Sequence, residues 1–113
     1  MKSSVVSRQL SVEASREDGY LYERQAQICK AFANPTRLHI LDLLGRKAQG
    51  VSELQAALGV SKANLSQHLG ILRNLGTIVT RRNGKQVYCA LAFPEIKQAC
   101  GLMRHVLRRL RST

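Results

Sequence analysis

Hydrophobic positions along the chain change their spacing several times, and each change predicts a new element. From Tyr20 apolar residues recur every three to four positions, which predicts an amphipathic helix. Asn34 and Pro35 end it and start a second helix, because asparagine is a good N-cap and proline suits the first helical position. The second helix stops at Gly45 or soon after. The apolar positions that mark these helices are Leu21, Ile28 and Phe32, then Leu38, Leu41 and Leu44.

Two short helices separated by a tight turn follow. Ser52 and Gln55 have the spacing of a capping box, which predicts a third helix that ends at Gly59 in a left-handed conformation. Ser61 then caps a fourth helix, which Gly76 closes. The inward residues expected of the fourth helix are Leu65, Leu69 and Leu72.

A basic hairpin and a last helix complete the pattern. Strands are expected over 77–82 and 85–91, joined by Asn83-Gly84 in a type I′ turn, which needs positive φ at both positions. Pro94 opens the last helix. Its apolar stripe comprises Ile96, Ala99, Cys100, Met103, Val106, Leu107 and Leu110.

This order of elements is that of a winged helix-turn-helix, a mainly α fold with a β-hairpin wing. Residues 1–18 are rich in serine and lack strong periodicity, so we expect a flexible N-terminal extension. Residues 19–113 then form one DNA-binding and dimerisation domain. The apolar stripe of the last helix exceeds what a chain of 113 residues covers easily, which favours a homodimer.

The fourth helix has the side chains that base recognition requires. With its leucines facing inward, short and amide side chains face outward, and asparagine or glutamine can hydrogen-bond bidentately to adenine. Lys62 and Arg73 lie nearer the flanks, where phosphate contacts are expected. His68 lies at the edge of the buried face, as a packed, hydrogen-bonded residue or as a DNA contact. The predicted DNA contacts of this helix are Lys62, Ala63, Asn64, Ser66, Gln67 and Arg73.

Charge supports a nucleic-acid partner. The net charge is +11, and residues 1–19 sum to zero, so the whole excess lies in 20–113. Arg81, Arg82 and Lys85 cluster at the hairpin tip, where a wing can reach the minor groove or the phosphate backbone. The expected partner is therefore double-stranded DNA. Binding of RNA or protein by the same fold, and a membrane-surface role of the arginine-rich last helix, are the competing interpretations.

Other classes of protein are disfavoured. No apolar run approaches a membrane span and the N-terminus lacks the apolar core of a secretory signal, so a cytoplasmic protein without a membrane partner is expected. Three widely separated cysteines argue against a secreted disulfide framework. Neither a nucleophile–base constellation nor a phosphate-binding glycine loop is present, which argues against an enzyme.

Three segments together resemble the ArsR/SmtB family of small bacterial repressors: FANPTRLHILDLL (32–44), VSELQAALGVSKANLSQHLGILRNLG (51–76) and RRNGKQVYCAL (81–91). The resemblance implies a homodimer formed through the first and last helices, which binds an operator with an imperfect palindrome and represses until an inducer arrives. Gly70 departs from the basic residue often found at that position.

The inducer is left open between three alternatives. Soft thiolates at Cys29, Cys89 and Cys100 suit a thiophilic metal or metalloid ion such as arsenite or antimonite, and nearby thiols also suit a redox or reactive-sulfur switch. The third alternative is no thiol sensing, since buried cysteines often act as small hydrophobic residues. Familiar family sites are missing: 50–54 holds no C-x-C, the last helix has a single histidine, and Asp42 occupies the position of the sulfur-sensing cysteine.

Overall fold

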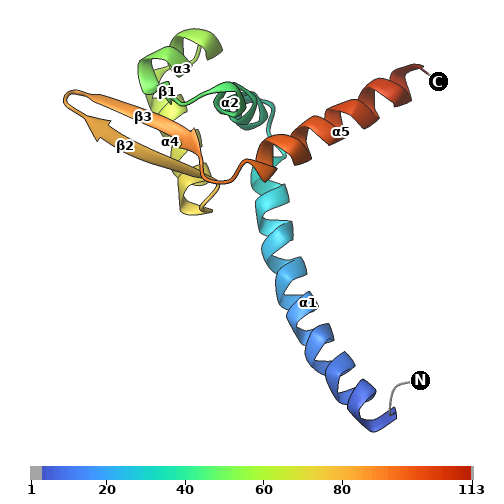
Figure 1. Cartoon of the computed structure of the whole chain (residues 1–113). Coiled ribbons are helices and arrows are strands. Elements are labelled where there is room, and N and C mark those ends of the chain that lie inside the picture. The colour runs from blue at the N-terminus through green and yellow to red at the C-terminus, as the bar shows by residue number, and fades with distance from the viewer. Residues whose placement is uncertain (1–3, 113) are drawn as a thin grey trace. The chain divides into compact units, whose positions relative to one another are not determined.

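The computed structural model describes the backbone of residues 4–112 and the side chains of residues 16–111. The chain divides into two compact units, residues 1–30 and 31–113. The elements, shown in Figure 1, are α1 (Ser4–Phe32), α2 (Pro35–Arg46), β1 (Gln49–Gly50), α3 (Val51–Leu58), α4 (Lys62–Asn74), β2 (Ile78–Asn83), β3 (Gln86–Leu91) and α5 (Glu95–Ser112). The predicted winged helix-turn-helix, mainly α with a β-hairpin, is confirmed.

The first unit contains most of α1, a helix that begins earlier than the periodicity predicts. The helix starts at Ser4, whereas the apolar stripe becomes recognisable only near Tyr20. The mobility expected of residues 1–18 stays a prediction. The first three residues of that segment lie outside the part of the chain that the structure describes.

The second unit holds the core. Leucine and isoleucine side chains from α2, α3 and α4 pack against β2 and β3. Leu38 is 43% exposed and Ile40 is fully buried, so the inward face of α2 is defined by Ile40, Leu41 and Leu44. Leu38 lies about 200° around the helix from Ile40 and therefore outside this face. The core residues are Ile40, Leu41, Leu44, Leu54, Leu65, Leu69, Leu72, Ile78 and Cys89.

Helix ends follow the predicted capping residues with one exception. Asn34 caps α2, because its Oδ1 accepts a hydrogen bond of 3.1 Å from the backbone N–H of Arg37. The predicted capping box of Ser52 and Gln55 is wrong: α3 begins at Val51, and Glu53 Oε1 accepts from the Gly50 N–H at 3.1 Å. Glu53 at the third helical position satisfies a donor that the strand pairing leaves free.

The sheet has three antiparallel strands in the order β1-β3-β2. The two-residue strand β1 was not predicted, since it exists only through pairing of Gln49 with Cys89 and of Gly50 with Tyr88. The hairpin closes at the pair Asn83 and Gln86. Gly84 has a φ of 66°, and among the described residues only glycines have a positive φ. Asn83 therefore lacks the positive φ that a type I′ turn requires, and the predicted type I′ turn at Asn83-Gly84 is wrong. Positive φ at the first loop residue alone is the arrangement of type II′.

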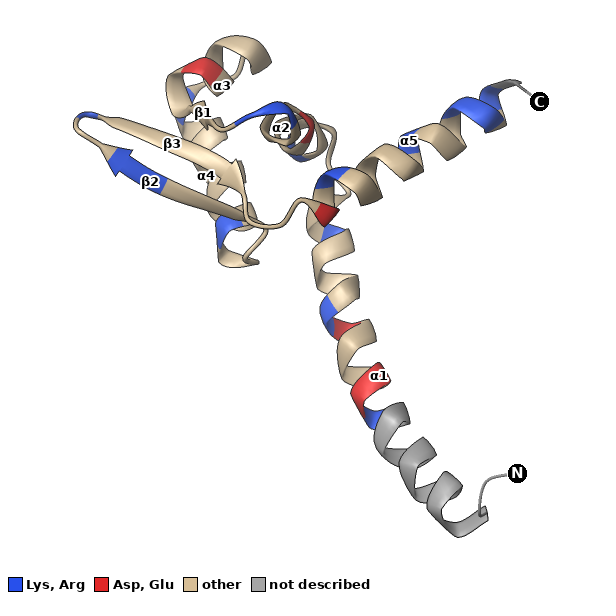
Figure 2. Ribbon diagram, viewed as in Figure 1, with Lys and Arg blue, Asp and Glu red and all other residues tan. Residues whose placement is uncertain are grey.

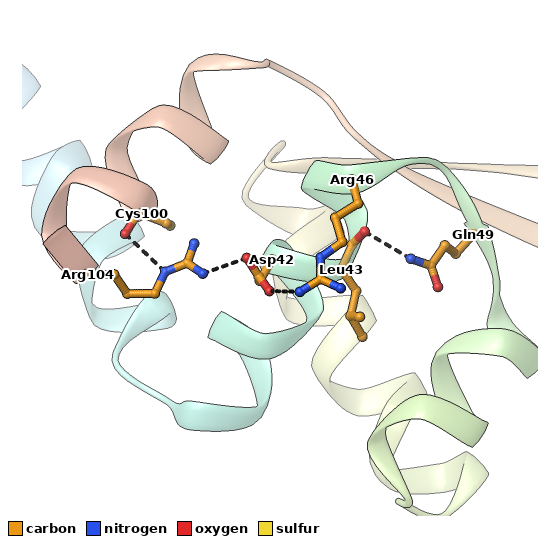
Figure 3. A network of polar contacts seen from close by, with 6 residues as sticks. All are labelled: Asp42, Leu43, Arg46, Gln49, Cys100 and Arg104. Carbon is orange, nitrogen blue, oxygen red and sulfur yellow. Dashed lines mark hydrogen bonds and ion pairs between the residues drawn. The ribbon is translucent and has the colours of Figure 1, made fainter. Parts of the chain in front are cut away.

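A polar network fixes α5 to α2 (Figure 3). Arg104 Nη1 of α5 donates to Asp42 Oδ1 at 2.6 Å, and Arg46 Nη2 donates to Asp42 Oδ2 at 3.2 Å. The hydrogen bond from Arg104, opposed by burial, lowers the pKa of Asp42. On the other side of α2, Gln49 Nε2 donates to the Leu43 carbonyl at 2.9 Å, which ties β1 to the same helix. The middle of α5 is thereby anchored on α2.

Candidate nucleic-acid interface

The turn between α3 and α4 sets the direction of the predicted recognition helix. Gly59 has φ of 66° and ends α3 in the predicted left-handed conformation. Ser61 Oγ then accepts from the Asn64 N–H at 3.1 Å and caps α4, as predicted. Leu65, Leu69 and Leu72 are buried and dock α4 on the core. One face of α4 therefore stays in solvent along its whole length.

The residues predicted to contact bases and flanking phosphates lie on that exposed face. Gln67 follows Ser66 in the middle of the helix, between the buried Leu65 and Leu69. Gly70 is half-buried, and a Cβ built there would meet nothing within 4 Å. The face is therefore low and open at its centre. The exposed predicted residues of α4 are Lys62, Ala63, Asn64, Ser66, Gln67 and Arg73.

His68 forms a contact with a residue that is distant in the sequence. The half-buried ring lies with Nδ1 3.2 Å from Nη1 of Arg37, a residue of the first turn of α2. Burial, and after it the positive charge of Arg37, lowers the pKa of His68. A packed, hydrogen-bonded histidine is thus confirmed. The pattern that predicts the N-cap at Asn34 places Arg37 in the same turn, but only the fold brings it to α4.

The wing carries the second group of predicted contacts. Arg81, Arg82 and Lys85 are exposed at the tip, which projects from the helical body in Figure 1. Each basic residue sits on a hairpin that β1 and the core hold at its base, through pairing with β3 and burial of Cys89. The wing tip can therefore present three positive charges to a partner without losing core contacts.

Acidic residues are excluded from this whole region. Glu53 and Glu95 bound a segment, 54–94, that contains no aspartate or glutamate and five basic residues. This segment comprises α4 and the entire hairpin. Figure 2 shows the blue basic positions of α4 and the wing, with the red positions of the second unit confined to α2, α3 and the start of α5. The surface therefore has the positive potential, without local neutralisation, that attracts a polyanion.

The three cysteine thiols differ in how deeply they are buried. Burial raises the pKa of the Cys89 thiol, which is 1% exposed as predicted. Burial also raises the pKa of the half-buried Cys100, against the opposing effect of Arg104. Cys29 is exposed on α1. Within residues 16–111, no three His, Cys, Asp or Glu side chains lie close enough to hold a metal ion, so this part of one copy holds no ligand set for the expected metal or metalloid site.

Comparison with known proteins defines the class. The family model described as "Bacterial regulatory protein, arsR family" matches residues 34–79, from the cap of α2 into β2. An HTH-type transcriptional regulator of Mycobacterium tuberculosis, Rv0081, is 38% identical over 81% of this chain and 82% of its own length. This chain belongs to the ArsR family of transcriptional regulators, as its resemblance predicts, and members of that class are not enzymes.

Solved structures agree. The crystal structure of Rv0081 matches with a TM-score of 0.75 over 81% of this chain and 93% of that one. A homodimeric winged helix-turn-helix DNA-binding domain of Mycobacterium bovis matches with a TM-score of 0.77 at 29% identity, over 85% and 90% of the two chains. A biofilm growth-associated repressor of Agrobacterium fabrum is 40% identical over 59% of this chain and 57% of its own length.

In the described part of the chain, no helix has the length and apolar character needed to cross a membrane.

Proposed function

We propose that this protein is a cytoplasmic, sequence-specific repressor that binds double-stranded operator DNA. The observation that carries the proposal is the acid-free segment 54–94, which combines an exposed helix of small and amide side chains with a basic wing. Asn64, Ser66 and Gln67 contact base edges in the major groove, flanked by Lys62 and Ala63. The family membership and the relatives named as repressors support this function.

Phosphate contacts come from the flanks of α4 and from the wing. Arg73 lies in the last turn of α4, and Arg81, Arg82 and Lys85 lie on the hairpin. A cation that contacts phosphate releases counterions, so its removal lowers the dependence of binding on salt by about 0.9 in log–log slope. The same removal weakens binding to every duplex alike, since phosphates carry no sequence information.

The DNA-binding form is a homodimer. On α5, Leu102, Met103, Val106 and Leu107 are 47% to 67% exposed, and they form one stripe beside the face that packs on α2. On α1, Tyr20, Leu21 and Tyr22 are each more than half exposed. A second copy of the chain covers both apolar surfaces in the proposed dimer. Two-fold symmetry then places the recognition helices about 34 Å apart, one turn of DNA, and matches an imperfect palindrome.

Titration of a mixed-sequence 30-base-pair duplex at several salt concentrations tests DNA binding. Arg82→Ala removes a wing cation, and Arg109→Ala removes the same charge from α5 as a matched control. We expect weaker binding and a lower salt slope for Arg82→Ala only. Equal losses in the two variants, or equal binding of the wild type to duplex DNA and to a structured RNA, would contradict the proposed interface.

The inducer is proposed to act through a thiol, with metalloid binding first and redox or reactive-sulfur chemistry second. The raised pKa values of the Cys89 and Cys100 thiols disfavour reactive thiolates at these two positions. Cys29 is exposed and is therefore the most accessible of the three candidate sensor thiols. Release of the operator complex by arsenite, antimonite, cadmium, peroxide or persulfide, repeated with each cysteine changed to serine, tests this. A wild-type complex that resists every reagent supports the third alternative, a regulator without thiol sensing.

A further inference from the structure

One side chain connects the start of α2 to the middle of the recognition helix. Arg37 Nε donates to the carbonyl oxygen of Ala31, in the last turn of α1. Nη1 of the same guanidinium lies 3.2 Å from His68 Nδ1 on α4. The backbone N–H of Arg37 is meanwhile held by the cap at Asn34. The backbone of Arg37 and its guanidinium are therefore each held at one point besides the contact with the histidine.

This contact determines the state of the imidazole ring. An arginine side chain has only donors and keeps its charge at every ordinary pH, so Nδ1 of His68 must accept. A ring that accepts at Nδ1 is neutral and carries its proton on Nε2. The lowered pKa of His68 agrees with a neutral ring at pH 7.

The protonated nitrogen is not fully buried. The ring is half-buried, and within residues 16–111 no buried side-chain nitrogen or oxygen lacks a hydrogen-bond partner. Among the same residues the only polar contact of the ring runs through Nδ1, so Nε2 is accessible. His68 directly follows the exposed Gln67 and precedes the buried Leu69, which places it at the edge of the DNA-facing surface. At this edge we expect a phosphate contact, which fixes the register of the protein on the duplex, rather than a base contact.

We propose that Arg37 is a positioning residue for DNA binding, which holds His68 so that its Nε2–H donates to a phosphate oxygen. The proposal rests on the proposed function. It joins the two alternatives for His68, because one ring nitrogen packs against Arg37 and the other contacts DNA. Arg37 itself does not touch the DNA.

Two substitutions separate the two nitrogens of the ring. His68→Asn keeps an acceptor near Nδ1 and removes the outer donor, whereas His68→Gln keeps a donor near Nε2. Arg37→Met keeps the length of the side chain and removes its donors, and Arg37→Lys restores one donor. The full chain is titrated with a mixed-sequence 30-base-pair duplex, since a phosphate contact needs no particular sequence. Thermal unfolding of every variant shows that the domain is folded at the temperature of the titration.

Arg37→Met should weaken binding about five-fold for each DNA-binding domain, the loss of about one hydrogen bond, when His68 is present. In the His68→Asn background the same change should have little effect, and Arg37→Lys should recover part of the loss. The salt slope should stay at the wild-type value in Arg37→Met. His68→Gln should bind better than His68→Asn.

Three results would overturn the inference. Equal losses for Arg37→Met with and without His68 would make Arg37 a general structural residue. A salt slope lower by about 0.9 for each copy would show that Arg37 contacts phosphate directly. A nitrogen NMR spectrum of the wild type with the His68 proton on Nδ1 would exclude the required ring state. Failure of the wild type to bind duplex DNA at all would instead reject the proposed function.

Discussion

The apolar stripe of α5 makes a quantitative prediction for Leu107→Asp. Leu107 is 55% exposed, so about half of its surface remains for a partner to cover. Full burial of a leucine is worth about 2 kcal/mol, so each copy gains about 1 kcal/mol at this position, and a two-fold dimer gains about 2 kcal/mol. Loss of that contribution raises the dimer dissociation constant about 30-fold. The buried carboxylate adds a desolvation cost, so 30-fold is a lower limit.

Sedimentation equilibrium over a range of protein concentrations measures this dissociation constant. His105→Asp is the matched control, because it places the same carboxylate on α5 about 200° around the helix from position 107. We expect a wild-type dissociation constant for His105→Asp. A monomeric wild type, or equal dissociation constants for both variants, would refute an interface through this stripe.

Two further predictions concern α2 and α4. Asp42→Asn should lower the free energy of unfolding by at most about 1 kcal/mol at pH 7, because both ion pairs of Asp42 are partly exposed. Because the pKa of Asp42 is lowered in the folded protein, this contribution is present above the unfolded pKa of about 3.9 and is lost as the pH falls through the folded pKa. The free energies of unfolding of Asp42→Asn and wild type, measured in urea, should therefore converge in acid. Gly70→Ala should stabilise α4 by about 0.5–1 kcal/mol in thermal unfolding, since the added Cβ meets nothing. The same methyl group should weaken DNA binding, and a more stable variant with unchanged affinity would contradict a close approach of DNA at Gly70.

Local signals in the sequence predict most of the fold. Asn34, Gly59 and Ser61 define helix ends because their caps depend on neighbours within a few residues. The alternation of Val87, Cys89 and Leu91 predicts the inward face of β3 correctly at Cys89. Family motifs are recognisable for the same reason, since helix, turn, helix and hairpin follow one another without interruption.

The predictions that failed depend on contacts between distant residues. β1 exists only because residues 49–50 pair with β3, and that pairing also moves the cap of α3 from Ser52 to Gly50 and Glu53. The contact of Arg37 with His68 spans 31 positions and has no periodic signature. At the hairpin, the register of β2 with β3 sets the loop one residue later than the Asn-Gly pair suggests.

The most direct test of the central claim compares the operator with random DNA. An operator selected from a pool of random duplexes is titrated with wild type, Gln67→Ala and Arg82→Ala at several salt concentrations. We predict that Gln67→Ala lowers affinity for the operator and leaves random-duplex binding near the wild-type value, while Arg82→Ala weakens both alike and lowers the salt slope. Equal proportional losses on operator and random DNA for Gln67→Ala would contradict base recognition by α4.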